Sequence, residues 1–286
     1  MRVVVTREQL NGQVAGGSVL VPTMGALHAG HGSLIAAADH WRRLHTPCLP
    51  VVVTAFVNPT QFNDRSDLAR YPRTPEADAS LCRACGADVV FAPDEREIYP
   101  PTQRVDVPEL PSVATKPGLE DAFRPGHFAG VCQVVARLFA LTNATAAFFG
   151  EKDWQQFKVI ESMARRDGGP RIIGAPTVRE PDGLAMSSRN VFLSPDDRRR
   201  ARSISRALCE AAGAVSPSEA ETLMRSILAE AGLASEYAVV RRATDLAYFK
   251  DQLETRTTPG RALIAARVGG VRLIDNAAWG AADAAV

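Results

Sequence analysis

Two histidines three residues apart, His28 and His31, close the run Pro22-Thr23-Met24-Gly25-Ala26-Leu27-His28-Ala29-Gly30-His31. A neutral imidazole can donate a hydrogen bond, and an imidazolium adds positive charge, so two of them can converge on one anion. Taken alone, such a pair is more often structural or metal-binding than catalytic. Its surroundings therefore decide how it is interpreted.

Those surroundings favour a phosphate. Residues 18–21 form an apolar run that predicts a strand, and helical spacing of apolar residues predicts a helix over 31–44. The free N–H groups and the dipole at a helix N-terminus attract phosphate, and Gly25 and Gly30 let the main chain approach a ligand closely. In a doubly wound sheet the first strand-to-helix junction is a nucleotide site. The turn is neither a G-x-G-x-x-G loop nor a P-loop, since no G-K-[ST] follows.

A second group of donors lies in residues 183–190, as Met186-Ser187-Ser188-Arg189. Arg189 can neutralise phosphate with its planar fork, and the two hydroxyls add short hydrogen bonds. An ordinary polar loop would look the same, so this segment gains meaning only beside the histidine turn.

Two further segments follow predicted strands. In Gly150-Glu151-Lys152-Asp153, Lys152 offers a mobile positive charge and Asp153 can hold a ribose hydroxyl, although a charged helix start with Asp153 near the cap is the favoured interpretation of this segment taken alone. In Phe56-Val57-Asn58-Pro59-Thr60-Gln61, amides flank an aromatic residue, and the alternative is an ordinary Asn-Pro turn. We expect all four segments to follow strand ends. Because the carboxyl ends of parallel strands share one edge, all four could face one crevice.

The order of elements predicts the fold. Further strands are expected at 49–56, 88–91, 146–149 and 171–174, with helices at 74–86, 131–141 and 154–166 between them. Alternating strands and helices predict an α/β, Rossmann-like, doubly wound parallel sheet, assigned to a catalytic domain of residues 1–177.

Residues 178–286 predict a smaller α+β domain. It has a helix capped by Ser194, a helix at 218–231, and strands at 237–241, 262–268 and 271–274, the last two joined at Gly269-Gly270. The basic run from Arg198 to Arg202 is interpreted as a solvated helix face, with an anion contact as the alternative.

Composition argues against several classes of protein. The chain has 33 basic and 32 acidic residues, so no global field attracts nucleic acid or an anionic membrane. No run approaches the ~20 apolar residues of a membrane span. No export signal is visible, and the five cysteines are odd in number and scattered, so we expect reduced thiols in the cytoplasm. Cys82-x-x-Cys85 lacks the second pair of a zinc site.

Taken together, these segments resemble the pantothenate synthetase (pantoate–β-alanine ligase) family. The matching stretches are PTMGALHAGH, FVNPTQF, YPRT (71–74), HFAGV (127–131), FFGEKDWQQ (148–156), PTVREPDGLAMSSRN (176–190) and GRALIAARVGGVRLIDN (260–276). The histidine turn is shared with nucleotidylyltransferases and class I aminoacyl-tRNA synthetases, whereas Gln61, Gln156 and the 176–190 run narrow the resemblance to this family.

The resemblance implies that ATP activates pantoate as pantoyl adenylate, which β-alanine then converts to pantothenate. It places ATP on residues 22 and 24–31 (Pro22, Met24, Gly25, Ala26, Leu27, His28, Ala29, Gly30, His31), on Gly150, Glu151, Lys152 and Asp153, and on Val178, Met186, Ser187, Ser188 and Arg189. It places pantoate on Gln61 and Gln156, with Asn58 and Phe56 beside them.

The catalytic residues implied are His31, as proton donor, with His28, Lys152, Arg189, Ser187 and Ser188. These groups and Mg²⁺ would stabilise the charge that grows as pyrophosphate leaves. The sequence assigns no metal ligands. The resemblance also implies a homodimer, and a C-terminal domain that closes as a lid. The alternatives left open are another nucleotidylyltransferase of this superfamily and a nucleotide-binding regulator without catalysis.

Overall fold

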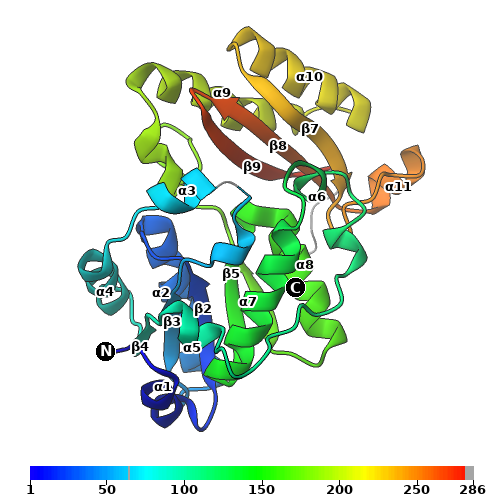
Figure 1. Cartoon of the computed structure of the whole chain (residues 1–286). Helices are drawn as coiled ribbons and strands as arrows, with labels where there is room; N and C mark the ends of the chain where they lie inside the picture. The colour runs from blue at the N-terminus through cyan, green and yellow to red at the C-terminus, as the bar shows by residue number, and fades with distance from the viewer. Residues whose placement is uncertain (64, 281–286) are drawn as a thin grey trace. The chain divides into compact units, whose positions relative to one another are not determined.

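The computed structural model describes residues 1–63 and 65–280 (Figure 1). The chain divides into two compact units. The N-terminal unit comprises residues 1–151 and 156–176, and the C-terminal unit comprises residues 152–155 and everything from Thr177 onward. The chain therefore leaves the first unit for four residues at 152–155, within one of the predicted site segments.

A six-stranded sheet forms the centre of the N-terminal unit. Its strands are β1 (Arg2–Val4), β2 (Ser18–Thr23), β3 (Val51–Ala55), β4 (Val89–Phe91), β5 (Ala144–Gly150) and β6 (Arg171–Ala175). All neighbours pair in parallel, in the order β1-β4-β3-β2-β5-β6. The chain builds outward from β2 through β3 to β4 and then returns to the other side of β2 with β5. The direction of winding thus reverses between β2 and β5, and ligands of doubly wound sheets bind at such a switch point.

Helices cover both faces of this sheet (Figure 1). The unit contains the helices α1 (Arg7–Val14), α2 (Ala29–His45), α3 (Arg65–Arg70), α4 (Pro75–Ala84), α5 (Glu95–Ile98), α6 (Glu120–Phe123), α7 (His127–Thr142) and most of α8 (Trp154–Arg166), with 3₁₀ turns η1 (Pro59–Gln61), η2 (Ser112–Ala114) and the start of η3 (Glu151–Asp153). Helix α2 contacts β2, β3 and β5 and is flanked by α4, whereas α7 contacts β2 and β5 and is flanked by α1 and α5.

The alternation of side chains along the strands explains this layering. Val19, Val21, Val51 and Val53 are fully buried on one face, where they join a cluster with Ile35 of α2. Leu20 and Val52 are equally buried but point to the opposite face, since successive side chains of a strand alternate. Strands buried on both faces read as continuous apolar runs, and this is the pattern that predicted them.

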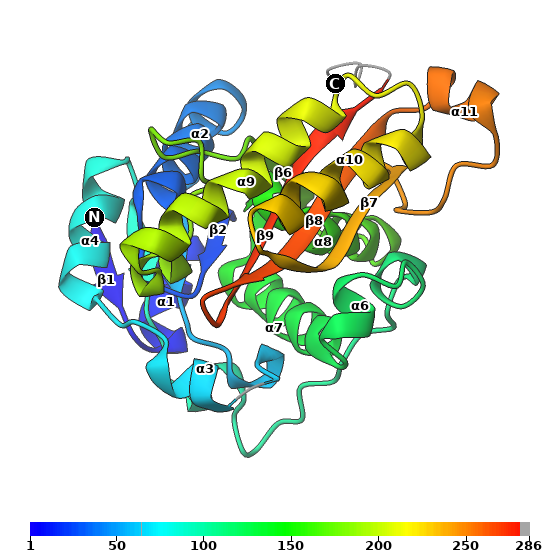
Figure 2. The same cartoon turned by 90° about the horizontal axis from the view of Figure 1, so that it is seen from above.

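The C-terminal unit has a three-stranded antiparallel sheet, β7-β8-β9, with helices along one face (Figure 2). Its elements are η4 (Ser188–Phe192), α9 (Pro195–Ala211), α10 (Pro217–Glu230), β7 (Ala234–Arg242), α11 (Gln252–Thr257), β8 (Gly260–Val268) and β9 (Val271–Trp279). Helices α9 and α10 bury Ile204, Leu208 and Met224 against the sheet. The β8–β9 hairpin turns at Gly269 and Gly270, both with positive φ, as a two-residue turn requires.

The predicted fold class, a Rossmann-like sheet with a small α+β unit, is confirmed. The sequence missed β1, α1 and the short helices α3, α5, α6 and α11, because three to eight residues are too few to show a period. The predicted start of α7 was four residues too late, and the predicted strands of the second sheet were too short. Among residues 1–63 and 65–280, no helix is long and apolar enough to cross a membrane.

Candidate active site

The two histidines form the N-terminus of α2. His28 is the N-cap residue, and its Nδ1 accepts a hydrogen bond from the backbone N–H of Gly30 at 3.2 Å. The N–H of His28 donates to Nδ1 of His31, also at 3.2 Å, and the ring centroids lie 4.1 Å apart. Because a backbone N–H can only donate, both Nδ1 atoms accept, and each neutral ring therefore carries its proton on Nε2. The turn thus presents two Nε2–H donors at a helix N-terminus that directly follows β2.

The turn before these histidines has an unusual backbone. Gly25 and Ala26 both have positive φ, of 78° and 51°. The carboxylate of Asp78, buried on α4, accepts hydrogen bonds from the N–H groups of Ala26 at 3.0 Å and Leu27 at 2.8 Å. Thr74 donates its hydroxyl to the same carboxylate at 2.9 Å. Ala26 in a left-handed conformation is costly, and the two charge-assisted bonds to Asp78 offset that cost.

Asp78 is a site residue that sequence reasoning missed. The carboxylates after Tyr71-Pro72-Arg73-Thr74 were visible in the sequence, but nothing there distinguishes a carboxylate that caps a distant turn from one that binds a metal. The partner is 51 residues away in the chain, and only the packing of α4 beside α2 brings the two together.

Gln61 lies next to the histidine turn. Its Nε2 contacts Sδ of Met24 at 2.9 Å, and its Oε1 accepts a hydrogen bond from Nδ2 of Asn58 at 3.1 Å. The main-chain carbonyl of Gln61 also contacts Nδ1 of His127 at 2.9 Å. The predicted proximity of the 22–31 and 56–61 segments is therefore present within this unit. Asn58 itself is buried, with only 1% of its surface exposed.

The packing of η1 against α7 holds Gln61 in place. A Cβ on Gly130 of α7 would lie 2.4 Å from the carbonyl oxygen of Thr60, so only glycine permits this approach. Phe56 is buried, and its ring lies 6.3 Å from the Tyr99 ring between centroids. Gln156 belongs to the same unit, as the third residue of α8.

The third predicted segment is split between the units. Gly150 ends β5 and Glu151 still belongs to the N-terminal unit, whereas Lys152 and Asp153 belong to the C-terminal unit. There the carbonyl of Lys152 accepts a hydrogen bond from Nδ2 of Asn276 at 2.8 Å. Trp154 donates its indole N–H to the carbonyl of Ala243 at 3.0 Å, and the Arg261 guanidinium lies 3.7 Å from the centre of its ring.

The sequence suggested that the 183–190 segment directly follows a strand end. In the structure it does not, because β6 already ends at Ala175. An isolated antiparallel bridge joins Arg179 to Ala185 after β6 has ended, so the chain folds back on itself. This bridge brings Val178 and Met186 together, with the Met186 N–H donating to the Val178 carbonyl at 3.0 Å. Ser187 then caps η4, which carries Ser188 and Arg189. Val178 and the residues Met186–Arg189 thus form one cluster within the C-terminal unit.

Partly buried ion pairs hold this cluster in place. Arg179 binds the carboxylate of Asp275 through two hydrogen bonds, of 2.7 and 3.1 Å. Arg198, from the predicted solvated run, is only 34% exposed and pairs with both Glu180 and Asp182. The hydrogen bond with Glu180 is the main cause of a raised pKa for the Arg198 guanidinium. Arg198 therefore holds the turn between Val178 and Met186, whereas Arg199 forms an exposed ion pair with Asp196.

The five cysteines are free thiols. Burial raises the pKa of the Cys82 and Cys132 thiols to about 12, so both are neutral at physiological pH. Residues 1–63 and 65–280 contain no group of three or more His, Cys, Asp or Glu side chains that could hold a metal ion. The carboxylate of Asp78, which lies beside the histidine turn, already accepts hydrogen bonds from two N–H groups and a hydroxyl.

Comparison with known proteins identifies the family. A sequence model described as pantoate–β-alanine ligase matches residues 2–278. The chain belongs to the pantoate–β-alanine ligase family. A pantothenate synthetase of Thioalkalivibrio sulfidiphilus is 47% identical over 273 residues, which cover 90% of this chain and 88% of that protein. One of Bradyrhizobium is 47% identical over 266 residues, covering 91% and 89%.

Solved structures of the ligase family share the fold. The pantothenate synthetase of Thermus thermophilus matches with a TM-score of 0.85 and 41% identity, covering 97% of this chain and 99% of that one. The pantoate–β-alanine ligase of Francisella tularensis, solved in complex with β-γ ATP and β-alanine, matches with a TM-score of 0.76 and 31% identity, covering 97% of each chain.

Proposed function

We propose that this chain condenses pantoate with β-alanine at the expense of ATP, by way of pantoyl adenylate. A carboxylate oxygen of pantoate attacks the α-phosphorus of ATP, and the bond to pyrophosphate breaks. The amine of β-alanine then attacks the acyl carbon, the bond to the AMP oxygen breaks, and the amine releases a proton. The reaction yields pantothenate, AMP and pyrophosphate.

The observation that carries this proposal is the orientation of the two imidazoles. His28 and His31 both present Nε2–H groups at the N-terminus of α2, beside the β2–β5 switch point. Donors held in place before the reaction stabilise charge that develops on phosphoryl oxygens as pyrophosphate leaves. In this proposal His31 donates to the departing pyrophosphate. Lys152, Ser187, Ser188 and Arg189, held in the C-terminal unit, add positive charge and hydrogen bonds to the same nucleotide.

Gln61 suits the acid substrate. Its neutral amide can bind the hydroxyls and carboxylate of pantoate without the strong ion pair that would make the carboxylate a poor nucleophile. Gln156 on α8 is proposed to bind the same substrate. The nucleotidylyltransferase and regulator alternatives lose support because the family match extends over nearly the whole chain.

Magnesium is proposed to enter with ATP. The described residues form no metal cluster, and Mg²⁺ in such sites is often held by substrate phosphates and water rather than by an all-protein cage. We also propose a homodimer, which sedimentation would show as twice the 30.7 kDa chain, and a C-terminal unit that shields the adenylate from water. The five free thiols suit a cytoplasmic location.

An isotope experiment tests the mechanism. Pantoate labelled with ¹⁸O in its carboxylate should transfer one labelled oxygen to AMP, because the acyl–oxygen bond of the adenylate breaks in the second step. Mass spectrometry of the AMP reads this directly. Label appearing instead in inorganic phosphate would indicate an acyl phosphate and would exclude the adenylate.

A further inference from the structure

The amide of Asn58 is fixed in one orientation by the main chain. Its Oδ1 accepts from the backbone N–H of Thr60 at 3.4 Å and from the Thr60 hydroxyl at 3.1 Å. Its Nδ2 donates to the carbonyl of Gly130 at 3.2 Å. A backbone N–H can only donate and a carbonyl can only accept, so the oxygen and nitrogen of Asn58 cannot be exchanged.

This orientation determines that of Gln61. The remaining hydrogen on Nδ2 of Asn58 points to Oε1 of Gln61 at 3.1 Å, which makes that oxygen an acceptor. The Nε2 group of Gln61 must then face the other way, where it lies 2.9 Å from Sδ of Met24 in the histidine turn. Gln61 therefore presents an NH₂ donor, and not a carbonyl oxygen, on the side of that turn.

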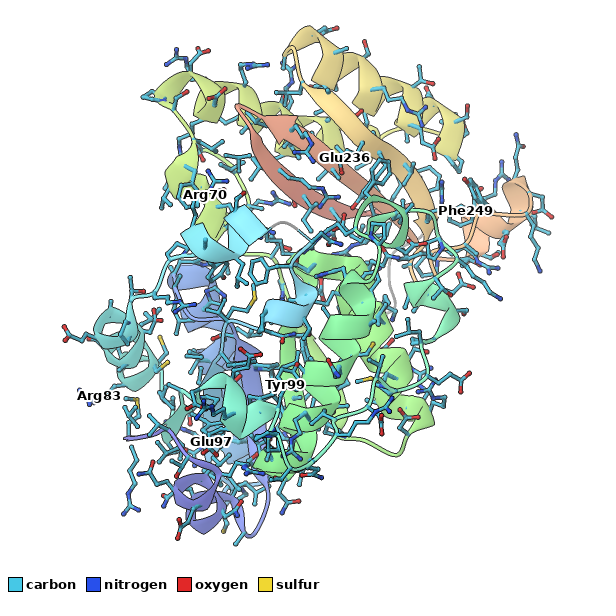
Figure 3. All side chains as sticks on the ribbon, viewed as in Figure 1. Arg70, Arg83, Glu97, Tyr99, Glu236 and Phe249 are labelled. Atoms are coloured by element: carbon cyan, nitrogen blue, oxygen red, sulfur yellow. The ribbon has the colours of Figure 1, made fainter. Side chains whose placement is uncertain are left out.

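Tyr99 completes the arrangement. Its hydroxyl lies 2.9 Å from Oδ1 of Asn58, and because that oxygen only accepts, Tyr99 must donate. Tyr99, labelled in Figure 3, caps the end of α5 and is half-buried beside Phe56. Burial is the main cause that raises the pKa of its phenol, so the O–H proton is retained at physiological pH.

We propose that Tyr99 is a positioning residue for the acid substrate: acting through Asn58, it holds the Gln61 amide with its NH₂ group directed at the bound acid. Carboxylate and hydroxyl oxygens accept from that NH₂ group, so the arrangement selects an oxygen-rich acid over one that lacks an acceptor there. The inference rests on the proposed function, in which Gln61 binds pantoate.

Tyr99→Phe removes the hydroxyl and keeps the ring that packs on Phe56. Loss of one neutral hydrogen bond predicts a KM for pantoate raised about three- to tenfold, with the KM for ATP unchanged. Tyr248→Phe is the matched control. Tyr248 is exposed in the C-terminal unit and is contacted through its ring by Arg241, a contact that phenylalanine keeps, so neither KM should move.

A double-mutant cycle with Gln61→Ala tests whether Tyr99 changes the KM for pantoate through Gln61. If Tyr99 acts through Gln61, Tyr99→Phe will not raise the KM for pantoate further once Gln61 is alanine. Equal, additive effects in both backgrounds would overturn the role of Tyr99 while leaving the assignment of Gln61 intact. A Gln61→Ala enzyme with an unchanged KM for pantoate would instead overturn that assignment, and the inference with it. An unchanged KM in Tyr99→Phe alone would also overturn the inference.

Discussion

The backbone N–H of His28 donates to Nδ1 of His31 across 3.2 Å, so one imidazole nitrogen of His31 is bound within its own helix turn and Nε2 carries the proton of the neutral ring. Nδ1 of His31 thus has a structural role, whereas Nε2–H is the donor in the proposed reaction. Substitutions that imitate one nitrogen at a time can separate the two roles.

His31→Asn keeps an oxygen close to the position of Nδ1 and loses the Nε2–H donor. We expect its fold and thermal unfolding to stay near those of the wild type, while adenylate formation falls by about 10²–10³-fold, the usual cost of one such donor. His31→Gln keeps a donor near Nε2 and loses the helix cap, so it should retain more activity than His31→Asn. Near-normal turnover in His31→Asn would show that the histidine is purely structural.

Asp78→Asn tests how the turn before the histidines is held. Asparagine offers one acceptor oxygen where the carboxylate offers two, so either Ala26 or Leu27 loses its partner. We expect the free energy of unfolding to fall by about 1–3 kcal/mol and the KM for ATP to rise. Glu76→Gln, an exposed change on the same helix, is the control. If urea denaturation and the KM for ATP of Asp78→Asn match those of this control, Asp78 does not hold the turn.

Asn276→Asp tests the hydrogen bond from the Asn276 side chain to the Lys152 carbonyl. Aspartate still accepts from Nε of Arg261, which lies 2.6 Å from Oδ1, but it cannot donate to the Lys152 carbonyl. We therefore expect a folded enzyme whose KM for ATP is raised about three- to tenfold and whose KM for pantoate is unchanged. Asn11→Asp, at an exposed position of α1, controls for the added charge. An equal rise in both KM values would indicate general damage instead.

Asp39 predicts an acid-sensitive contribution to stability. Burial acts to raise its pKa, but hydrogen bonds from Arg43 and Arg42 outweigh burial and lower the pKa below the ordinary value of 3.8. A lowered folded pKa means stability that is fully present above that ordinary value and lost as pH falls through the folded pKa. Asp39→Asn should thus be less stable than the wild type at pH 7, with the difference shrinking below about pH 4.

Denaturation curves at several pH values measure this difference. Asp106→Asn is the control, since Asp106 forms its ion pair with Arg104 and both side chains are exposed. A stability difference for Asp39→Asn that stays constant from pH 7 to pH 3 would contradict the assignment.

The sequence predicted what depends on local pattern. The apolar strands, the glycine turn and the helix after it predicted the parallel sheet, and the structure places Ser187 and Arg189 in one local turn. The sequence could not predict Asp78 or Tyr99, whose partners lie 51 and 41 residues away and depend on how helices pack. It also could not show that Lys152 belongs to the C-terminal unit, because the bond from Asn276 spans 124 residues.

The central claim is that ATP is cleaved by the acid before the amine takes part. Pyrophosphate release in one turnover, followed with a coupled phosphate assay after rapid mixing, measures this directly. The account predicts release from ATP and Mg²⁺ when pantoate is present without β-alanine, and none when β-alanine is present without pantoate. Release that requires β-alanine, or none under saturating pantoate, would contradict it.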